Sequence, residues 1–559
     1  MSQPPKFSFQ SLANNNLVVF GFLWAIAFVL YLPTIHAGFV GDFPYWIDGL
    51  KNDSLWDYIN IKNSFTLYHT EQLSVYVLYK LSGIHPWPWH IVFITLHALN
   101  GALLFKLFST LLIDSGITNA RYLALVSVCL FIICPHASEA VVWKCVNHFL
   151  LVPAIMFLIL VMVQKFHTTQ KKWYALMTGL LFAYICFSLE FFYLTPVFVL
   201  ILICYYHFVL GVDKRIFKQA LVLFFVPITS LLILYFTVLR IYSHTFISHY
   251  GGLSVHSIYY YLDKPLKYLF HVVFLGRFFP NNIRNSVYNF TEIKAVIIII
   301  YALILMFWGY VLLNFKKVTM RVKLVALVSA YLFATYMFMS PLIFADSLLV
   351  YFDRYTYLSN GFTYFLLVLL ISFIPSRVAQ IVLFVGYALV NVRFTEKVNK
   401  YWKQSAGVID HLLHQMPDPG NKTVLFLNTP DDLNGVPMIA AEPEGRYKTM
   451  INSLTPRPVP NKIYDVLAYN MSNEHDGAHV TIVNDSVMHV TLNQWGTWWL
   501  FGMLGAQSYS NSDFSVNVVD QGHWYELTLR HPADQYLLLY QVGYELKVVD
   551  WNKKNIDQY

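Results

Sequence analysis

The sequence predicts a polytopic α-helical membrane protein with a small β-rich domain at its C-terminal end, and three observations lead to this fold class. The 559 residues are 57% hydrophobic and only 12% charged, which is about half the charged share of soluble proteins. Apolar runs of about 20 residues recur, and each is long enough to cross a bilayer. After residue 396 these runs stop, and short alternating runs typical of strands begin.

The apolar runs predict about eleven transmembrane helices. The expected spans are 17–37, 91–113, 120–137, 145–165, 173–189, 191–210, 217–241, 293–314, 323–345, 358–374 and 377–395. The first run is too long for the apolar core of a cleavable signal peptide and is interpreted as a spanning anchor. The polar segment after it has about 50 residues, which predicts one or two interfacial helices rather than a simple loop.

Loop charges predict the orientation. Lys and Arg gather in three short loops, around Lys171, Lys214 and Lys316, and loops of this kind stay in the cytoplasm. The N-terminus is then expected inside and the C-terminal domain outside, with the chain in contact with the lipids of a plasma membrane such as the bacterial inner membrane. Because these loops hold much of the basic charge, the net charge of +7 predicts no nucleic-acid partner.

Three parts are expected: a transmembrane domain over 1–396, a helical linker over 397–420 and an extracytoplasmic β-rich domain over 421–559. Strands are predicted at 423–428, 479–483, 489–492, 514–519 and 536–540, where β-branched or alternating runs are separated by turn residues. In the outer segment 242–291, apolar spacing predicts an amphipathic helix over 263–275, capped by Asp263 and ended by Gly276. That helix either lies on the bilayer or packs on the bundle.

Asp42 is the strongest candidate for a catalytic base. It follows the first span in Gly38-Phe-Val-Gly-Asp42-Phe-Pro-Tyr-Trp46. A carboxylate at the membrane boundary meets both water and lipid headgroups, and it can take a proton from an acceptor hydroxyl. The neighbouring rings of Phe43, Tyr45 and Trp46 suit contact with a lipid or a sugar face. The alternative is a solvated acid at the end of a span, and the spacing leaves both interpretations open.

Glu139 stands just outside the third span, after Pro135. An ionisable side chain near membrane depth is costly and is therefore a functional candidate by default. Glu139 would orient an acceptor or, together with Asp42, bind a divalent cation such as Mg²⁺ or Mn²⁺. His136 beside it is a weak metal-ligand candidate, because no ligand spacing accompanies it. A loop ion pair between Glu139 and Lys144 is the alternative.

Glu190 has apolar residues on both sides, so its carboxylate needs a partner. The charged candidates are His148, Lys144 and Arg354, and a structural ion pair is the alternative to a functional role. His148 begins the fourth span and is expected to line the same cavity.

Arg354 precedes an apolar span in Asp353-Arg-Tyr-Thr-Tyr357. A guanidinium group offers a fork of donors that matches phosphate oxygens. Tyr355 and Tyr357 are expected to help hold a phosphate or a prenyl chain. The alternative is an interfacial pair between Arg354 and Asp353.

Other chemistries find little support. The chain has no phosphate-binding loop, zinc-protease, serine-hydrolase or dinucleotide-binding motif. Its five cysteines form no C-x-x-C pair, and a bridge between Cys134 and Cys145 is the one pairing that their positions allow in principle. His90, His97 and Asn100 share one side of a helix, where buried packing roles are commoner than metal binding. Trp495, Trp498 and Trp499 suit either stacking on sugar rings or core packing.

Several of these motifs, taken in order, resemble the GT-C superfamily of integral-membrane glycosyltransferases, and in particular bacterial relatives of the TPR-containing transmembrane O-mannosyltransferases. The matching elements are the acid Asp42 after the first span, the helix Trp89-His-Ile-Val-Phe-Ile-Thr-Leu-His97-Ala-Leu-Asn100, the loop from Pro135 to Trp143, Ser188-Leu-Glu190, and Asp353-Arg-Tyr-Thr-Tyr-Leu-Ser-Asn-Gly-Phe362. The resemblance covers about residues 20–370. The TPR repeats are absent, and Phe43 stands where the family often has a second acid.

The resemblance implies an inverting transferase that moves a sugar from a polyprenyl-phosphate donor to an acceptor hydroxyl of a glycan, lipid or protein. It implies Asp42 as general base, Arg354 on the donor phosphate, and Glu139 and Glu190 as supporting acids. Two other classes remain open: a transporter or flippase for lipid-linked glycans, and a non-catalytic protein of envelope-glycan assembly. A transporter would favour internal repeats and polar residues at mid-membrane depth, whereas here no repeat is found and the notable acids lie at one rim.

Overall fold

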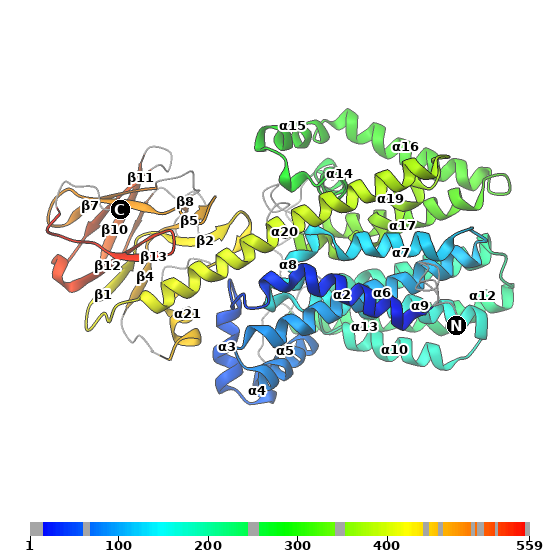
Figure 1. Ribbon diagram of the computed structural model, residues 1–559. Helices are drawn as coiled ribbons and strands as arrows, with labels where there is room; N and C mark the ends of the chain where they lie inside the picture. The colour runs from blue at the N-terminus through cyan, green and yellow to red at the C-terminus, as the bar shows by residue number, and fades with distance from the viewer. Residues whose placement is uncertain are drawn as a thin grey trace, which may run out of the picture.

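A bundle of long helices and a β-rich C-terminal region make up the protein (Figure 1). The computed structural model describes residues 15–59, 67–243, 257–340, 353–439, 446–456, 462–492, 498–499, 508–519 and 524–553. Among these residues, eight helical segments are long and apolar enough to cross a membrane. They are Asn16–Thr34, Pro86–Asp114, Lys144–Thr169, Glu190–Val209, Lys214–Ile241, Lys294–Leu313, Met320–Met339 and Arg377–Gln415. The chain is therefore an integral membrane protein with multiple spans.

The main bundle helices agree closely with the predicted spans. They are α2 (Asn16–Tyr31), α6 (Pro86–Asp114), α7 (Ala120–Ile132), α9 (His148–Thr169), α10 (Trp173–Ile185), α11 (Thr195–Cys204), α12 (Lys214–Ala220), α13 (Val226–Ser243), α16 (Lys294–Leu313), α17 (Met320–Met339), α19 (Tyr357–Ile371) and α20 (Arg377–Gln415). Each of the eleven predicted ranges contains a helix, but α10 and α19 have only 13 and 15 residues. The predicted count of eleven thus exceeds the eight helices that meet both length and apolarity.

The third predicted span is bent. Its first half, α7, ends before Pro135, and η2 (Pro135–Ala137) with α8 (Ser138–Val142) continues at 57° to it. Proline has no backbone N–H to continue a helix, which explains the break. The bend places Glu139 on the short helix α8, and η3 (Lys144–Val146) then leads into α9. Counted as one span, the pair brings the total for the described residues to nine.

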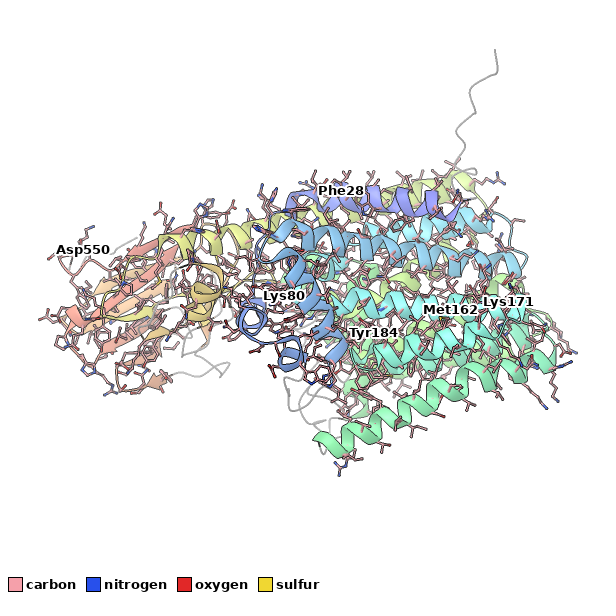
Figure 2. The ribbon with its side chains drawn as sticks, turned by 90° about the horizontal axis from the view of Figure 1, so that it is seen from below. Phe28, Lys80, Met162, Lys171, Tyr184 and Asp550 are labelled. Carbon is pink, nitrogen blue, oxygen red and sulfur yellow. The ribbon has the colours of Figure 1, made fainter. Side chains whose placement is uncertain are left out.

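Short helices cover one end of the bundle. After the first span come α3 (Phe43–Asn52), α4 (Leu55–Ile59) and α5 (His69–Ser82). In Figure 1 these helices lie at the end that faces the β-rich region, whereas α2 begins toward the opposite end. Figure 2 shows Lys80 at the first end and Lys171, from a predicted cytoplasmic loop, at the other. The basic loop and the β-rich region thus lie at opposite ends, and which end faces the cytoplasm stays a prediction.

The predicted amphipathic helix is longer than expected. It is α14 (Ile258–Val273), so Asp263 does not cap it, and Gly276 belongs to the following η7 (Gly276–Phe278). The capping prediction is wrong because the helix already begins after Ser257. Asp263 instead pairs with Lys267, one turn later, at 2.8 Å. α14 buries this charged side and leaves Leu269 and Phe274 exposed, and α15 (Asn281–Thr291) follows it.

The C-terminal region contains three sheets, and all five predicted strand ranges hold strands. The first sheet has the order β13-β12-β1-β4, with β1 (Thr423–Phe426) parallel to β12 (Tyr536–Val542) and β4 (Ile463–Asp465), and β13 (Glu545–Val548) at its edge. The second is β6-β7-β11-β10-β9, built from Ala478–Ile482, Val487–Leu492, Trp524–Leu529, Phe514–Val519 and Ser508–Ser510. The third is β3-β2-β5-β8, built from Val436–Pro437, Thr429–Leu433, Ala468–Met471 and Trp498–Trp499.

The β-rich region is tied to the bundle by one continuous helix and by direct hydrogen bonds. α20 runs unbroken from Arg377 to Gln415 and connects the bundle to the first strand (Figure 1). Close by, α21 (Arg446–Leu454) packs against α3, and the Ser453 hydroxyl donates to the Pro44 carbonyl at 2.9 Å. Lys51 on α3 donates to the Ser453 carbonyl at 2.8 Å. The C-terminal region therefore covers α3, the helix that directly follows Asp42.

Buried polar residues of the bundle behave as packing groups, as expected for α6. His97 hydrogen-bonds to the Tyr357 hydroxyl at 2.7 Å, and Asn100 donates to the Leu150 carbonyl at 2.9 Å. Cys134 and Cys145 are both buried free thiols, so the pairing that their positions allowed does not form. Trp495 and the side chains of Trp498 and Trp499 lie outside the described residues.

Candidate active site

A cavity of about 350 Å³ lies at the end of the bundle that faces the β-rich region. Its polar and aromatic lining includes Asp42, Tyr68, Glu71, Trp143, His148 and Arg354. Three of these, Asp42, His148 and Arg354, were predicted as site residues. The other three predicted residues, Glu139, Glu190 and Tyr355, lie behind the lining and contact it. All six therefore belong to one neighbourhood, although they are spread over 314 residues of sequence by their numbering.

Asp42 is exposed at the start of α3. The preceding Gly41 has φ +63°, a backbone conformation that favours glycine. A Cβ at Gly41 would lie 3.0 Å from the Trp143 ring, so the loop passes directly over that indole. The Trp143 ring N–H also donates to the Val40 carbonyl at 3.1 Å. These contacts fix the place where the Asp42 carboxylate enters the cavity.

Phe43, which stands where the resembling family often has a second acid, is fully buried. Its ring stacks on Phe39 at 4.7 Å and meets the edge of Trp89 at 5.0 Å. Together with Ile47 and Leu50 it forms the buried stripe of α3. The position is therefore a core position in this chain, and the loop offers Asp42 to the cavity while Phe43 anchors the helix.

Lys144 holds the loop before Asp42. Its ammonium group donates to the Ala37 carbonyl at 2.6 Å and to the Gly38 carbonyl at 3.3 Å, and it lies 2.8 Å from His90 Nε2. The alternative that Lys144 pairs with Glu139 is therefore wrong, because Lys144 binds loop carbonyls. A buried ammonium needs such acceptors to offset its lost hydration.

Arg354 is paired with Glu139 by two hydrogen bonds. The Arg354 backbone N–H donates to Glu139 Oε2 at 2.7 Å, and Nη1 of the guanidinium donates to Oε1. The guanidinium also lies over three rings: Trp143 and Tyr355 at 5.0 Å and Phe149 at 5.8 Å. Such packing holds a cation in place with little freedom. The alternative pairing of Arg354 with Asp353 is not what the fold forms, because Asp353 is turned to other partners.

Glu71 is a cavity residue that the sequence did not reveal. It is buried on α5 and makes an ion-pair contact with His148, through Oε1 and Nδ1. The signal was present, since an acid within a half-apolar helix always needs a partner, but nothing local indicates which one. Glu190 accepts a hydrogen bond from the Tyr68 hydroxyl at 2.7 Å, and Tyr68 was not among its expected partners. The rings of Tyr68 and His148 stack at 6.3 Å.

A second charged cluster lies behind the cavity, centred on Asp353. His136 Nδ1 and His271 Nε2 lie 2.9 and 2.7 Å from Asp353 Oδ1, and Arg277 Nη1 donates to Oδ2. All four side chains are buried. Burial alone would raise the pKa of Asp353, but the Arg277 guanidinium and the His136 imidazole hold it well below its usual value. Burial and the nearby His136 lower the pKa of His271 to about 4.

The cluster has the residue types of a metal centre, because candidate ligand atoms of His136, His271 and Asp353 lie within 4.8 Å of one another. Among the described residues, no group of this kind includes Asp42 or Glu139, the two acids predicted to bind a divalent cation. The separations of 2.7 and 2.9 Å are those of direct hydrogen bonds. With Arg277 as the counter-charge, the Asp353 carboxylate is held in a hydrogen-bonded ion pair, whereas His136 Nε2 and His271 Nδ1 have no hydrogen-bond partner among the described residues.

Comparisons with known proteins find only a distant structural likeness. No family model matches the chain, and no curated protein matches it. Two crystal structures of ArnT from Cupriavidus metallidurans are similar to it, one in the apo state and one bound to undecaprenyl phosphate. They share 11% and 12% identity with this chain, with TM-scores of 0.34 and 0.33, and each alignment covers 80% of this chain and 92% of the other.

Proposed function

We propose that this protein is a membrane glycosyltransferase that moves a sugar from a polyprenyl-phosphate donor to an acceptor hydroxyl at the outer face of the membrane. One observation carries the proposal: Asp42, an exposed acid, and Arg354, a fixed cation, line the same cavity at the end of the bundle. A carboxylate and a guanidinium that line one cavity suit a reaction in which one group takes a proton and the other stabilises a departing phosphate. The order of sequence motifs that resembles the GT-C superfamily, and its O-mannosyltransferase relatives, supports the same class.

The proposed reaction is a single displacement. The Asp42 carboxylate accepts the proton of the acceptor hydroxyl while the acceptor oxygen bonds to the anomeric carbon of the sugar. The bond between that carbon and the phosphate oxygen breaks, and the polyprenyl phosphate leaves with the electron pair. Because attack and departure occur on opposite faces of the carbon, the configuration inverts. Arg354 offers the leaving phosphate a positive charge that is already in place.

The remaining residues support these two. Glu139 and Tyr355 hold the Arg354 guanidinium by a hydrogen-bonded pair and by ring contact. Glu71 orients His148 through Nδ1, so that the imidazole offers its other nitrogen, Nε2, to a sugar hydroxyl or a phosphate oxygen. Glu190 fixes the Tyr68 hydroxyl. A divalent cation, if the reaction uses Mg²⁺ or Mn²⁺, would be held by Asp42 at the cavity, since Glu139 is already paired with Arg354.

The test is transfer by the purified protein in lipid, supplied with polyprenyl-phosphate sugars and assayed for release of polyprenyl phosphate. Asp42→Asn keeps the size of the side chain and removes the base, so the rate should fall by about 10²–10⁴. The matched control is Asp57→Asn, an exposed acid of the neighbouring α4, and it should keep the wild-type rate. Full activity in Asp42→Asn would refute the assignment. A protein that moves the lipid across the bilayer without releasing polyprenyl phosphate would be a flippase.

A further inference from the structure

Through one short hairpin, the C-terminal β-rich region contacts the Asp42 loop directly and the Arg354 segment by way of Arg277. This hairpin, residues 429–438, consists of β2, the turn at Asn434 and Gly435, and β3 with the residue that follows it. On one side the Gly41 backbone N–H donates to the Met438 carbonyl at 2.6 Å. On the other side Arg277 Nη2 donates to the Asn434 carbonyl at 2.7 Å. Gly41 is the residue before Asp42, and Arg277 binds the residue before Arg354.

Arg277 is the link on the Arg354 side. Nη1 of its guanidinium binds the Asp353 carboxylate while Nη2 binds the hairpin. Asp353 is the first residue of η9 (Asp353–Thr356), and Arg354 follows it directly. A planar guanidinium presents its donors in a fixed fork, so its two acceptors are held in one geometry. Arg277 therefore fixes the position of Asp353, and through it that of Arg354, relative to the hairpin.

The hairpin is itself held firmly. The Asn434 backbone N–H donates to the Met471 carbonyl at 3.1 Å, and its side-chain amide donates to the Ser472 carbonyl at 2.7 Å. Ser405 of α20 donates to the Pro437 carbonyl at 3.0 Å. Inside the turn, the Gly435 N–H donates to Asp432 at 2.8 Å. These bonds join the hairpin to β5 and to α20, so the hairpin is held in one position and is not a free loop.

We propose that the 429–438 hairpin is a structural part of the active site and that Arg277 is a positioning residue, which sets Arg354 relative to Asp42 without touching substrate. This rests on the proposed function for its chemical meaning. The coupling itself, in which the hairpin joins the Asp42 loop to the Arg354 segment, rests on the hydrogen bonds alone. The separation of the base from the phosphate-binding cation is then fixed by the C-terminal region, which explains why this region covers this end of the bundle.

Hydrogen exchange followed by mass spectrometry tests the coupling without any need for activity. In Arg277→Met the peptide that covers residues 37–44 should exchange about tenfold faster, as expected when a local opening becomes easier by roughly one hydrogen bond. Within the described part of the chain, Arg277 bonds to Asp353 and Asn434 and not to that peptide. A merely local role for Arg277 would therefore leave the exchange of the peptide unchanged. The control is Lys267→Met, which breaks a buried ion pair with Asp263 on α14 and should leave 37–44 at the wild-type rate.

A charge-balanced variant separates positioning from stability. In the double variant Arg277→Met, Asp353→Asn, the carboxylate that loses its guanidinium counter-charge in the single variant is removed, so stability should recover while fast exchange of 37–44 persists. If transfer activity is present, kcat should fall by about tenfold with the donor KM unchanged, whereas Arg277→Lys should recover only part of kcat. Wild-type exchange of 37–44 in Arg277→Met would overturn the coupling. Absence of transfer in the wild-type protein would overturn the proposed function but leave the exchange result decisive.

Discussion

Two consecutive residues of η9 meet the same short segment of the bundle in different ways. Arg354 pairs with Glu139 and lines the cavity, whereas Asp353 pairs with His136 and is sealed from it. Both pairs are buried and both satisfy a charge that would otherwise be costly. The difference lies in what each side chain can reach: Arg354 lines the cavity, whereas Asp353 is not among the residues that line it. Burial and pairing alone therefore do not distinguish a catalytic charge from a structural one.

Substitution of Arg354 should have the largest effect. In Arg354→Lys the charge remains near Glu139 but the fork is lost, so transfer should fall by about 10²–10³ with a higher donor KM. In Arg354→Ala the Glu139 carboxylate is left buried and unpaired, which should also lower the free energy of unfolding by about 3–5 kcal/mol. Kinetics and denaturation of the two variants measure both quantities. Equal donor KM in Arg354→Lys and wild type would show that this cation does not hold the phosphate.

Substitution of Asp353 should change the kinetics in a different way from substitution of Arg354. Asp353→Asn leaves the Arg277 guanidinium without its buried counter-charge, so the free energy of unfolding should fall by about 3–5 kcal/mol. Because Asp353 is not among the residues that line the cavity, kcat should fall while the donor KM stays near the wild-type value. A steady-state titration with donor distinguishes this result from that of Arg354→Lys. A raised donor KM in Asp353→Asn would show that Asp353, like Arg354, affects donor binding.

The sequence predicted the residues of this comparison but not the partners with which they pair. Hydropathy located the helices, since a bilayer demands long apolar runs, and alternation located the strands. Costly charges marked Asp42, Glu139, Glu190 and Arg354. The partners could not be predicted, because Glu139 and Arg354 are 215 positions apart and no local pattern encodes such contacts. For the same reason Glu71, which pairs with His148, was missed, and Glu190 was assigned partners other than Tyr68.

The smallest effect on transfer is expected in the hairpin, at Asp432. Burial raises its pKa to about 8, although the Gly435 N–H opposes this. The folded state therefore keeps a proton between about pH 4 and 8 that the unfolded state releases. Stability contributed by Asp432 is thus greatest at low pH and declines as pH rises through this window. Asp432→Asn can keep the bond to Gly435 and should flatten that decline, as thermal unfolding from pH 5 to pH 8 will measure. An unchanged slope would show that Asp432 does not titrate in this range.

The most direct test of the central claim, that Asp42 and Arg354 divide base and phosphate binding within one cavity, is the affinity of the purified protein for polyprenyl phosphate. Asp42→Asn should bind it within about twofold of wild type while transfer is lost, and Arg354→Lys should bind it at least about tenfold more weakly. Wild-type affinity in Arg354→Lys, or weakened binding in Asp42→Asn with transfer intact, would contradict the account.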